Sequence, residues 1–388
     1  MARITQLDPN LRQSGGGSGP IRYLPLDAPG LRVTGLLGWE EEQVLHRLPR
    51  AYRAVFETVN PAVAALGRDT AGGQLSFRSD TRALWLRAEL EAPVELCHMT
   101  AIGQGGFDCY AGTDRRDLAF VGVSKFPPAA QSYQCELVSH QALRALDRGA
   151  PGRKFHEFTV NFPLYCGVRR LEIGVDPEAA VLPPSPPAQP GSLVFYGTSI
   201  TQGACASRPG LSYPALLSRA LGLPAYNFGF SGNGLGEPEM AALLSEIRDP
   251  LLYMIDYEAN AGERGCLEAT LEPLVQRLRE AHPETPVLVV SKPASLFDAL
   301  DPRKRVQWMH LRRFQRETVR RLCAELGRVA FLDGQTLLPQ EPWDLTVDLV
   351  HPTDTGFAEM ARGMLPAVRE LLDEQPLCAL ARTAGTSG

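Results

Sequence analysis

The sequence has no run that approaches the roughly 18 consecutive apolar residues of a membrane-spanning helix, so we expect no membrane partner. Its first ten residues, MARITQLDPN, lack the apolar stretch of a secretory signal. Basic residues are also in short supply: 39 of them face 44 acidic ones, for a net charge of −5. This balance argues against a nucleic-acid partner, because phosphate binding needs a basic surface.

The eight cysteines lack the spacing of a metal site, since none forms a CxxC pair or sits at zinc-finger distance from a histidine. The sequence also has no Walker A motif and no GxGxxG segment after a predicted strand. We therefore expect no cofactor and no metal. Without an export signal, reduced thiols in the cytoplasm are the expected state.

The length and one proline-rich segment predict two domains. A single hydrophobic core stops growing at roughly 250–300 residues, and this chain has 388. Residues 182–191 read LPPSPPAQPG, in which five prolines favour a stiff linker. We predict an N-terminal domain over residues 1–181, a linker over 182–191, a second domain over 192–374 and a flexible tail over 375–388. A short, stiff linker also predicts that the domains pack together.

The first half of the chain has the pattern of short, half-buried strands. Residues 84–90 place Leu84, Leu86, Ala88 and Leu90 on one face and polar residues on the other. Similar runs follow at residues 94–100, 118–124, 132–139, 156–162 and 169–175. Many short strands separated by turn residues are typical of an all-β sandwich or jelly roll. The pattern of residues 40–66 is less clear and leaves open whether this segment contains a short helix.

The second half changes to longer alternating units. Continuous apolar runs predict strands at residues 193–196, 225–228, 251–255, 287–290 and 329–332. Helical patterns lie at residues 213–221, 237–247, 267–281, 305–326 and 355–372. Buried strands that alternate with helices predict an α/β fold, in which helices cover both faces of a parallel sheet.

Four polar segments follow strands of this sheet or precede its last helix. They are residues 196–203, 227–234, 256–260 and 348–352. Ligands of open parallel sheets bind beyond the carboxyl ends of the strands, so we expect these segments to share one rim. Together they supply a hydroxyl, backbone amides beside glycine, a side-chain amide, and a carboxylate close to an imidazole. Acyl transfer by a serine nucleophile needs this inventory.

Residues 192–373 resemble the SGNH, or GDSL-type, esterase and acyltransferase superfamily. Its four name-giving residues correspond to Ser199, Gly232, Asn260 and His351, in the same chain order. The resemblance implies a three-layer, flavodoxin-like parallel-sheet domain. The sequence has Gly-Thr-Ser-Ile at 197–200 where the family has Gly-Asp-Ser-Leu, and Tyr-Glu-Ala-Asn at 257–260 where it has Gly-x-Asn-Asp.

The first half resembles the β-sandwich domain that precedes the catalytic domain in one subgroup of this superfamily. That domain carries a Gly-x-Asp-Leu-Tyr motif. Here the motif is Gly106-Phe-Asp-Cys-Tyr110, with Cys109 in place of leucine. The two-domain order of the chain is also that of the subgroup.

These matches suggest a role for each site residue. Ser199 is the expected nucleophile, at a strand-to-helix turn that exposes its hydroxyl. Its backbone N–H, the N–H of Gly232 and the side-chain amide of Asn260 are expected to form an oxyanion hole. His351 is the expected general base, oriented by Asp348 three residues earlier. Turn or helix-capping roles are the alternative interpretation of Ser199, Gly232 and Asn260.

Other polar and aromatic residues near these segments fit structural roles better. We interpret Asp354 as the N-cap of the last helix and Glu258 as a solvated loop acid. Cys205 follows the serine turn and is interpreted as a small packing residue rather than a nucleophile. Trp308 and Trp343 either wall a substrate pocket or belong to a core.

The leading hypothesis is a serine-dependent ester hydrolase that forms a covalent acyl-enzyme on a small-molecule or carbohydrate ester. An acyltransferase that moves an acyl group to a small-molecule hydroxyl uses the same residues and is the first alternative. A non-catalytic carbohydrate-binding protein is the second. Assembly into a homo-oligomer is left open by the sequence.

Overall fold

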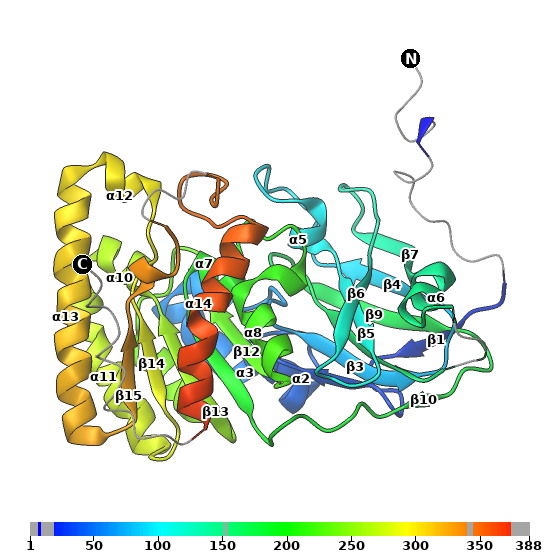
Figure 1. Cartoon of the computed structure of the whole chain (residues 1–388), viewed down its shortest axis with the longest axis horizontal. Helices are drawn as coiled ribbons and strands as arrows, with labels where there is room; N and C mark the ends of the chain where they lie inside the picture. Colours follow the sequence, from blue (N-terminus) through cyan, green and yellow to red (C-terminus); the bar gives the residue numbers. More distant parts are fainter. Residues whose placement is uncertain (1–6, 9–18, 150–151, 153, 340–343, 374–388) are drawn as a thin grey trace.

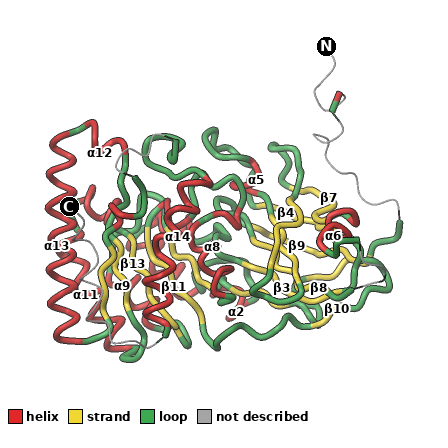
Figure 2. Tube along the Cα trace, viewed as in Figure 1, coloured by secondary structure: helices red, strands yellow, loops and turns green. Residues whose placement is uncertain are grey.

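A computed structural model of the chain describes residues 7–8, 19–149, 152, 154–339 and 344–373. The predicted tail at 375–388 lies outside the described residues, and so does Trp343. The two halves of the sequence lie side by side, with antiparallel strands on the right of Figure 1 and helices around a parallel sheet on the left. Figure 2 shows the same division, with helices gathered mainly around the second group of strands.

Two antiparallel sheets make up most of the first half. One has the order β1-β9-β4-β7, formed by Arg22–Pro25, Val168–Val175, Leu84–Leu90 and Ser132–Val138. The other has the order β10-β3-β8-β5-β6, formed by Val181–Leu182, Gln74–Ser79, His156–Asn161, Asp108–Gly112 and Leu118–Val123, with β2 (Arg32–Thr34) beside β3. The helix α6 (His140–Leu146) follows β7. The predicted β-sandwich is confirmed.

The core of the sandwich follows from the two-residue period of its strands. Leu84, Leu86, Ala88 and Leu90 of β4 are buried together with apolar residues of both sheets, while Arg87 on the opposite face is exposed. Successive side chains of a strand point to opposite faces, so β4 buries one row completely, whereas the other row combines buried Trp85 with half-buried Glu89 and exposed Arg87.

The predicted strand at residues 94–100 is wrong. The backbone N–H groups of Glu95 and Leu96 donate to the side-chain Oε1 of Gln104, at 2.6 and 3.1 Å, and not to a neighbouring strand. The segment therefore turns into the short helix α5 (Ala101–Gly105), whose N-cap is Thr100. The Gln104 side chain thus accepts N–H groups that would otherwise pair with a neighbouring strand. The segment instead reaches the second half of the chain, where the Thr100 hydroxyl donates to the Ser207 carbonyl at 2.6 Å.

A five-stranded parallel sheet of order β12-β11-β13-β14-β15 organises the second half. Its strands are Ala225–Gly229, Ser192–Gly197, Pro250–Asp256, Val287–Val290 and Val329–Leu332. The helices around it are α7 (Ser199–Gln202), α8 (Tyr213–Leu221), α9 (Pro238–Ser245), α10 (Glu258–Arg264), α11 (Leu267–Ala281), α12 (Leu296–Leu300), α13 (Pro302–Leu326) and α14 (Asp354–Leu372). This flavodoxin-like strand order confirms the predicted fold class.

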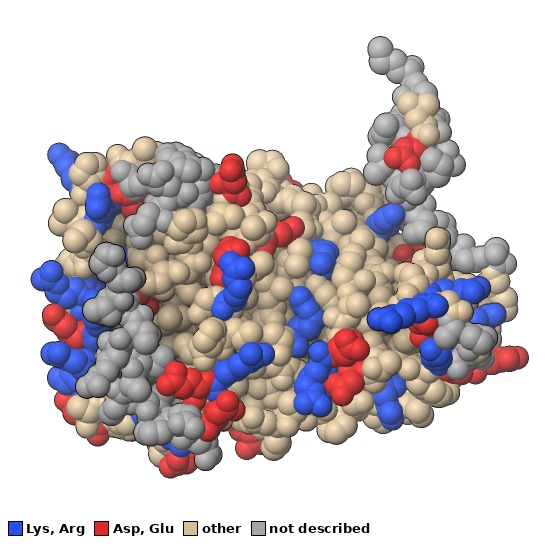
Figure 3. All heavy atoms as spheres, in the orientation of Figure 1, with Lys and Arg blue, Asp and Glu red and all other residues tan. Residues whose placement is uncertain are grey.

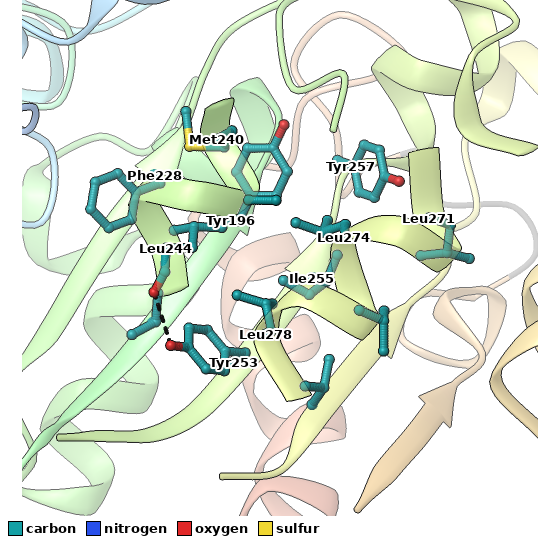
Figure 4. Close-up of a cluster of buried hydrophobic side chains, with 14 of the residues drawn as sticks. Tyr196, Phe228, Met240, Leu244, Tyr253, Ile255, Tyr257, Leu271, Leu274 and Leu278 are labelled. Atoms are coloured by element: carbon teal, nitrogen blue, oxygen red, sulfur yellow. Dashed lines mark hydrogen bonds between the residues drawn. The ribbon is translucent and has the colours of Figure 1, made fainter. Parts of the chain in front are cut away.

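Alternation within the strands assigns residues to the two faces of this sheet. Val194 and Tyr196 of β11 belong to the core shared with α9, α11 and α13. Leu193 and Phe195 belong to the core shared with α8 and α14. Figure 4 shows part of the first core, where the hydroxyl of Tyr253 donates to the Leu244 carbonyl at 2.9 Å. Helices therefore cover both faces, giving three layers.

Three short helices from the first half pack into the core that contains Val194 and Tyr196. They are α2 (Leu37–Glu42), α3 (Arg50–Val59) and α4 (Pro61–Leu66). Their residues Leu37, Phe56 and Val63 are buried in the same cluster as Tyr226 and Phe228 of the edge strand β12. The division of the chain at residues 181 and 182 stays a prediction, and packing crosses it.

The surface carries charges of both signs. On the face drawn in Figure 3, basic and acidic side chains are interspersed over both halves of the molecule. Among the described helices, none combines the length and apolar character that crossing a bilayer requires.

Candidate active site

Ser199 is the first residue of α7, directly beyond the carboxyl end of β11. A capping box fixes this turn: the Thr198 hydroxyl accepts the N–H of Ile200, and the Thr201 hydroxyl accepts the N–H of Thr198, both at 3.2 Å. The turn is tight, since a Cβ at Gly197 would lie 2.0 Å from the Thr201 hydroxyl oxygen. It holds the serine side chain at the rim of the sheet.

The structure brings Ser199, His351 and Asp348 into one hydrogen-bonded chain. The Ser199 Oγ lies 2.8 Å from Nε2 of His351, and Nδ1 of the same ring lies 2.6 Å from Oδ2 of Asp348. Asp348 Oδ1 also accepts the backbone N–H groups of His351 and Val350, at 2.8 and 3.2 Å. Leu349 has a φ of 72°, which closes this short loop so that acid and imidazole face each other.

The charge of Asp348 decides the state of the imidazole. Burial raises the pKa of this carboxyl, but hydrogen bonds from the backbone N–H and ring of His351 outweigh it, so the pKa lies below its usual value. The carboxylate is therefore ionised at neutral pH and holds a proton on Nδ1. Nε2 is then the acceptor that faces the Ser199 hydroxyl.

Three donors of the predicted site residues have no acceptor in the part of the chain that the structure describes. They are the backbone N–H groups of Ser199 and Gly232 and the Nδ2 amide of Asn260. The side-chain oxygen of Asn260 fixes the orientation of this amide, because Oδ1 accepts the N–H of Gly234 at 3.2 Å. Gly232 has a φ of 69° and open space where a Cβ would stand. Such unused donors are the chemical requirement of an oxyanion hole.

The loop that carries Gly232 is packed against the turn that carries Ser199. The Phe230 N–H donates to the Gly197 carbonyl at 3.0 Å, and a Cβ at Gly234 would lie 2.4 Å from that same carbonyl. The Gln202 side chain accepts the N–H of Ser231 at 3.1 Å. The loop is therefore fixed at both ends, relative to the turn between β11 and α7 that carries Ser199.

Two polar residues of the first half hold the residues that support this loop. Asp69 accepts a hydrogen bond from Gln202 Nε2 at 2.9 Å, and burial raises its pKa to about 7 against the opposing charge of Arg47. Arg47 is 1% exposed and donates to the carbonyls of Asn227, at 3.2 Å, and Gly229. Sequence reasoning missed both residues, because a lone arginine and a lone aspartate carry no motif.

The Gly106–Tyr110 segment lies between the two halves and outside the Ser199–His351–Asp348 chain. Asp108 is fully buried and accepts hydrogen bonds from Arg208 at 2.7 Å and from the Gly210 N–H at 3.0 Å. Burial raises the pKa of Asp108 despite these partners. The motif thus holds the loop after α7, and only indirectly the residues of the site.

Other residues of the first half do reach the site. The ring of His98 lies 6.3 Å, centroid to centroid, from the ring of His351. The hydroxyl of Tyr165 donates to the Ser199 carbonyl at 3.4 Å. The wall of the site is therefore built partly by the N-terminal half, which no pattern in the sequence indicated.

Two of the secondary interpretations are wrong. Glu258 is not a solvated loop acid: it is 1% exposed and accepts hydrogen bonds from the Lys292 N–H at 2.6 Å and the Gln315 amide at 2.7 Å. Burial raises its pKa to about 7. The N-cap of α14 is Thr353, and Asp354 instead accepts the N–H of Ser207 at 2.7 Å.

The two remaining candidates are buried. Trp308 is 6% exposed and belongs to the core on one face of the parallel sheet. Cys205 is 7% exposed, and burial, reinforced by the charge of Asp348, raises its thiol pKa to about 12. A protonated thiol is a poor nucleophile, which agrees with a packing role in the resting protein.

Comparison with known families gives two matches that together take in most of the chain. Residues 191–369 match the model of the GDSL-like lipase/acylhydrolase family. Residues 22–181 match the GxDLY model, described as the N-terminus of SGNH-hydrolase-type esterases. Comparison with curated proteins gives no match.

Among solved structures, three are similar to this chain over most of its length. A protein described as a GDSL-like lipase from Bacteroides ovatus is 28% identical, with a TM-score of 0.79, and the alignment covers 92% of this chain and 99% of that one. The salicylyl-acyltransferase SsfX3 from a tetracycline biosynthetic pathway is 20% identical, with a TM-score of 0.72 and the same coverage. A family two carbohydrate esterase from Clostridium thermocellum, solved with cellohexaose, is 16% identical, with a TM-score of 0.52 and coverage of 78% and 93%.

Proposed function

We propose that this chain, which over residues 191–369 belongs to the GDSL-like lipase/acylhydrolase family, is a serine-dependent ester hydrolase that works through a covalent acyl-enzyme. Membership of the family makes the chain an esterase or acyltransferase, as expected from its sequence. The observation that carries the finer proposal is the hydrogen-bonded chain from Ser199 through His351 to Asp348, with contacts of 2.8 and 2.6 Å.

In the proposed reaction, Nε2 of His351 takes the proton of the Ser199 hydroxyl as Oγ attacks the ester carbonyl carbon. The Asp348 carboxylate stabilises the imidazolium that forms. The negative charge on the former carbonyl oxygen is bound by the unused donors of Ser199, Gly232 and Asn260. His351 then protonates the departing alcohol, which leaves an acyl group on Ser199.

Water completes the cycle. His351 takes a proton from a water molecule that attacks the acyl-enzyme carbonyl, and then returns the proton to Ser199 Oγ as the acid is released. If a small-molecule hydroxyl occupies the place of water, the same steps transfer the acyl group. The whole-length likeness to the salicylyl-acyltransferase favours this as the second candidate function.

We propose a short-chain ester of a small polyol or carbohydrate as the substrate. Support comes from the fold shared with the family two carbohydrate esterase, and from the contribution of His98 and Tyr165 to one wall of the site. We propose the cytoplasm as its compartment, because no disulfide joins any of the described cysteines.

Turnover of an activated acetyl ester, with and without glycerol as acceptor, tests the function. We expect release of the chromogenic alcohol and of free acetate, with acetate as the main product in both reactions. Acetylated glycerol as the main product would favour the transferase. Absence of turnover on short acyl esters would contradict the proposed esterase activity and favour the carbohydrate-binding alternative.

Replacing Asn260 by alanine tests the oxyanion hole. We expect kcat to fall by about 10²–10³-fold, equivalent to about 2.7–4 kcal/mol, with little change in KM, because the amide binds charge that exists only in the transition state. Glu263→Gln on the same helix is the control, since Glu263 is exposed and pairs with Lys304. A similar change in kcat or KM in both variants would assign the effect to a disturbance of α10 rather than to loss of the Asn260 amide.

A further inference from the structure

We propose that His98, Cys205 and Asp348 form a binding site for a zinc-class divalent ion, and that the bound ion inhibits the enzyme. Their ligand atoms all lie within 4.8 Å of one another. The site is distinct from the proposed catalytic chemistry, which needs no metal, but it shares the Asp348 carboxylate with it. The binding part of the inference stands alone, whereas the inhibitory part rests on the proposed function.

The three ligands come from three separated segments of the fold. His98 lies in the loop before α5, Cys205 in the loop after α7, and Asp348 in the loop before α14. Imidazole, thiolate and carboxylate are the ligand types that zinc combines in proteins. A nitrogen and a sulfur ligand also disfavour Mg²⁺ and Ca²⁺, which take oxygen ligands.

Each ligand has coordination capacity left. The ring nitrogens of His98 have no hydrogen-bond partner within the described ranges, and the exposed ring leaves solvent a path to the site. The Cys205 sulfur makes one weak contact, to the His98 carbonyl at 3.8 Å. Oδ2 of Asp348 keeps a lone pair beyond its bond to the His351 ring, whereas Oδ1 accepts two backbone N–H groups of the same loop.

Geometry and charge both suit a divalent ion. Tetrahedral zinc, with bonds of about 2.0–2.3 Å, places its ligand atoms about 3.3–3.8 Å apart. The ligand atoms here lie within 4.8 Å of one another, and rotation of the exposed His98 side chain toward the other two ligands shortens its distances to them. Cys205 binds as thiolate and releases its proton to solvent, so thiolate and carboxylate together neutralise the two positive charges. A fourth position is left for water.

Occupation of this site opposes the proposed catalytic cycle. An ion on Asp348 withdraws electron density from the carboxylate that holds Nδ1 of His351. It also adds positive charge beside a ring that must become an imidazolium when it takes the serine proton. Binding therefore lowers kcat, and removal of the ion by a chelator restores it.

Binding is tested without reference to activity. Co²⁺ is titrated into metal-free protein, and thiolate-to-cobalt charge-transfer absorption is followed. We expect one ion per chain, no thiolate band in Cys205→Ser, and affinity at least about tenfold weaker in His98→Ala. Cys97→Ser is the matched control, because Cys97 is exposed, adjoins His98 and is not part of the cluster. A thiolate band that persists in Cys205→Ser, or vanishes in Cys97→Ser, overturns the site.

Inhibition is tested by titrating Zn²⁺ against ester turnover, with each variant normalised to its own metal-free rate. We expect inhibition of the unmodified chain and of Cys97→Ser, reversal by EDTA, and resistance in His98→Ala and Cys205→Ser. Equal sensitivity in all four proteins overturns the inhibitory role. Co²⁺ binding is also measured in Ser199→Ala: an intact band there keeps the metal site even if the proposed function fails.

Discussion

Replacing Ser199 by alanine should reduce kcat by about 10⁶-fold, because in the proposed mechanism it removes the atom that forms the acyl-enzyme and leaves only substrate binding and the oxyanion donors. The fold should be unaffected, since the capping box that shapes the turn uses Thr198 and Thr201 and not the serine hydroxyl. Steady-state turnover of an activated acetyl ester measures the loss. Ser207→Ala, in the loop after α7, is the matched control and should keep its activity.

A fluorophosphonate distinguishes a nucleophile from a residue that only supports one. The reagent should attach to the unmodified chain once, on the peptide that contains Ser199, and should not attach to Ser199→Ala. Labelling of Cys205, or full turnover by Ser199→Ala, would contradict the proposed mechanism. Labelling of Cys205 is not expected, since burial, and then the charge of Asp348, raises the pKa of its thiol to about 12.

Local sequence pattern was enough to predict most of the fold. The five apolar runs of the second half are strands β11 to β15. A strand of a parallel sheet is buried on both faces, so its sequence is a continuous apolar run that can be recognised locally. The predictions failed where distant partners decide the outcome. Residues 94–100 have the apolar content of a strand, but Gln104 takes their N–H groups. Glu258 is buried because Gln315, on α13, reaches it.

In the candidate site, too, the residues with a local sequence signature could be predicted, and those with distant partners could not. The order of Ser199, Asp348 and His351, and the spacing of the last two, can be recognised in the sequence, and the structure brings these three side chains together. Their supports cannot be recognised in this way. Arg47 reaches the strand β12 of the other half, and the His98–Cys205–Asp348 cluster joins three loops without any sequence spacing to mark it.

Replacing Asp348 by asparagine should lower kcat by about 10⁴-fold while leaving substrate binding nearly unchanged. The amide cannot hold a proton on Nδ1 of His351 as the carboxylate does, so the ring loses the tautomer in which Nε2 accepts the serine proton. It also loses the negative charge that stabilises the imidazolium. Turnover of the same acetyl ester measures the effect, and Asp344→Asn, an exposed acid four residues away, is the control.

The same substitution changes how stability depends on pH. The folded pKa of Asp348 lies below its usual value, because hydrogen bonds from the His351 N–H and ring outweigh the opposing effect of burial. The carboxylate therefore stabilises the fold above its unfolded pKa of about 3.9, and this contribution is lost as pH falls through the lower folded value. Thermal unfolding should accordingly show a smaller acid-dependent decrease in Asp348→Asn than in the unmodified chain. An unchanged pH profile together with unchanged kcat would mean that the carboxylate neither orients His351 nor supports its loop.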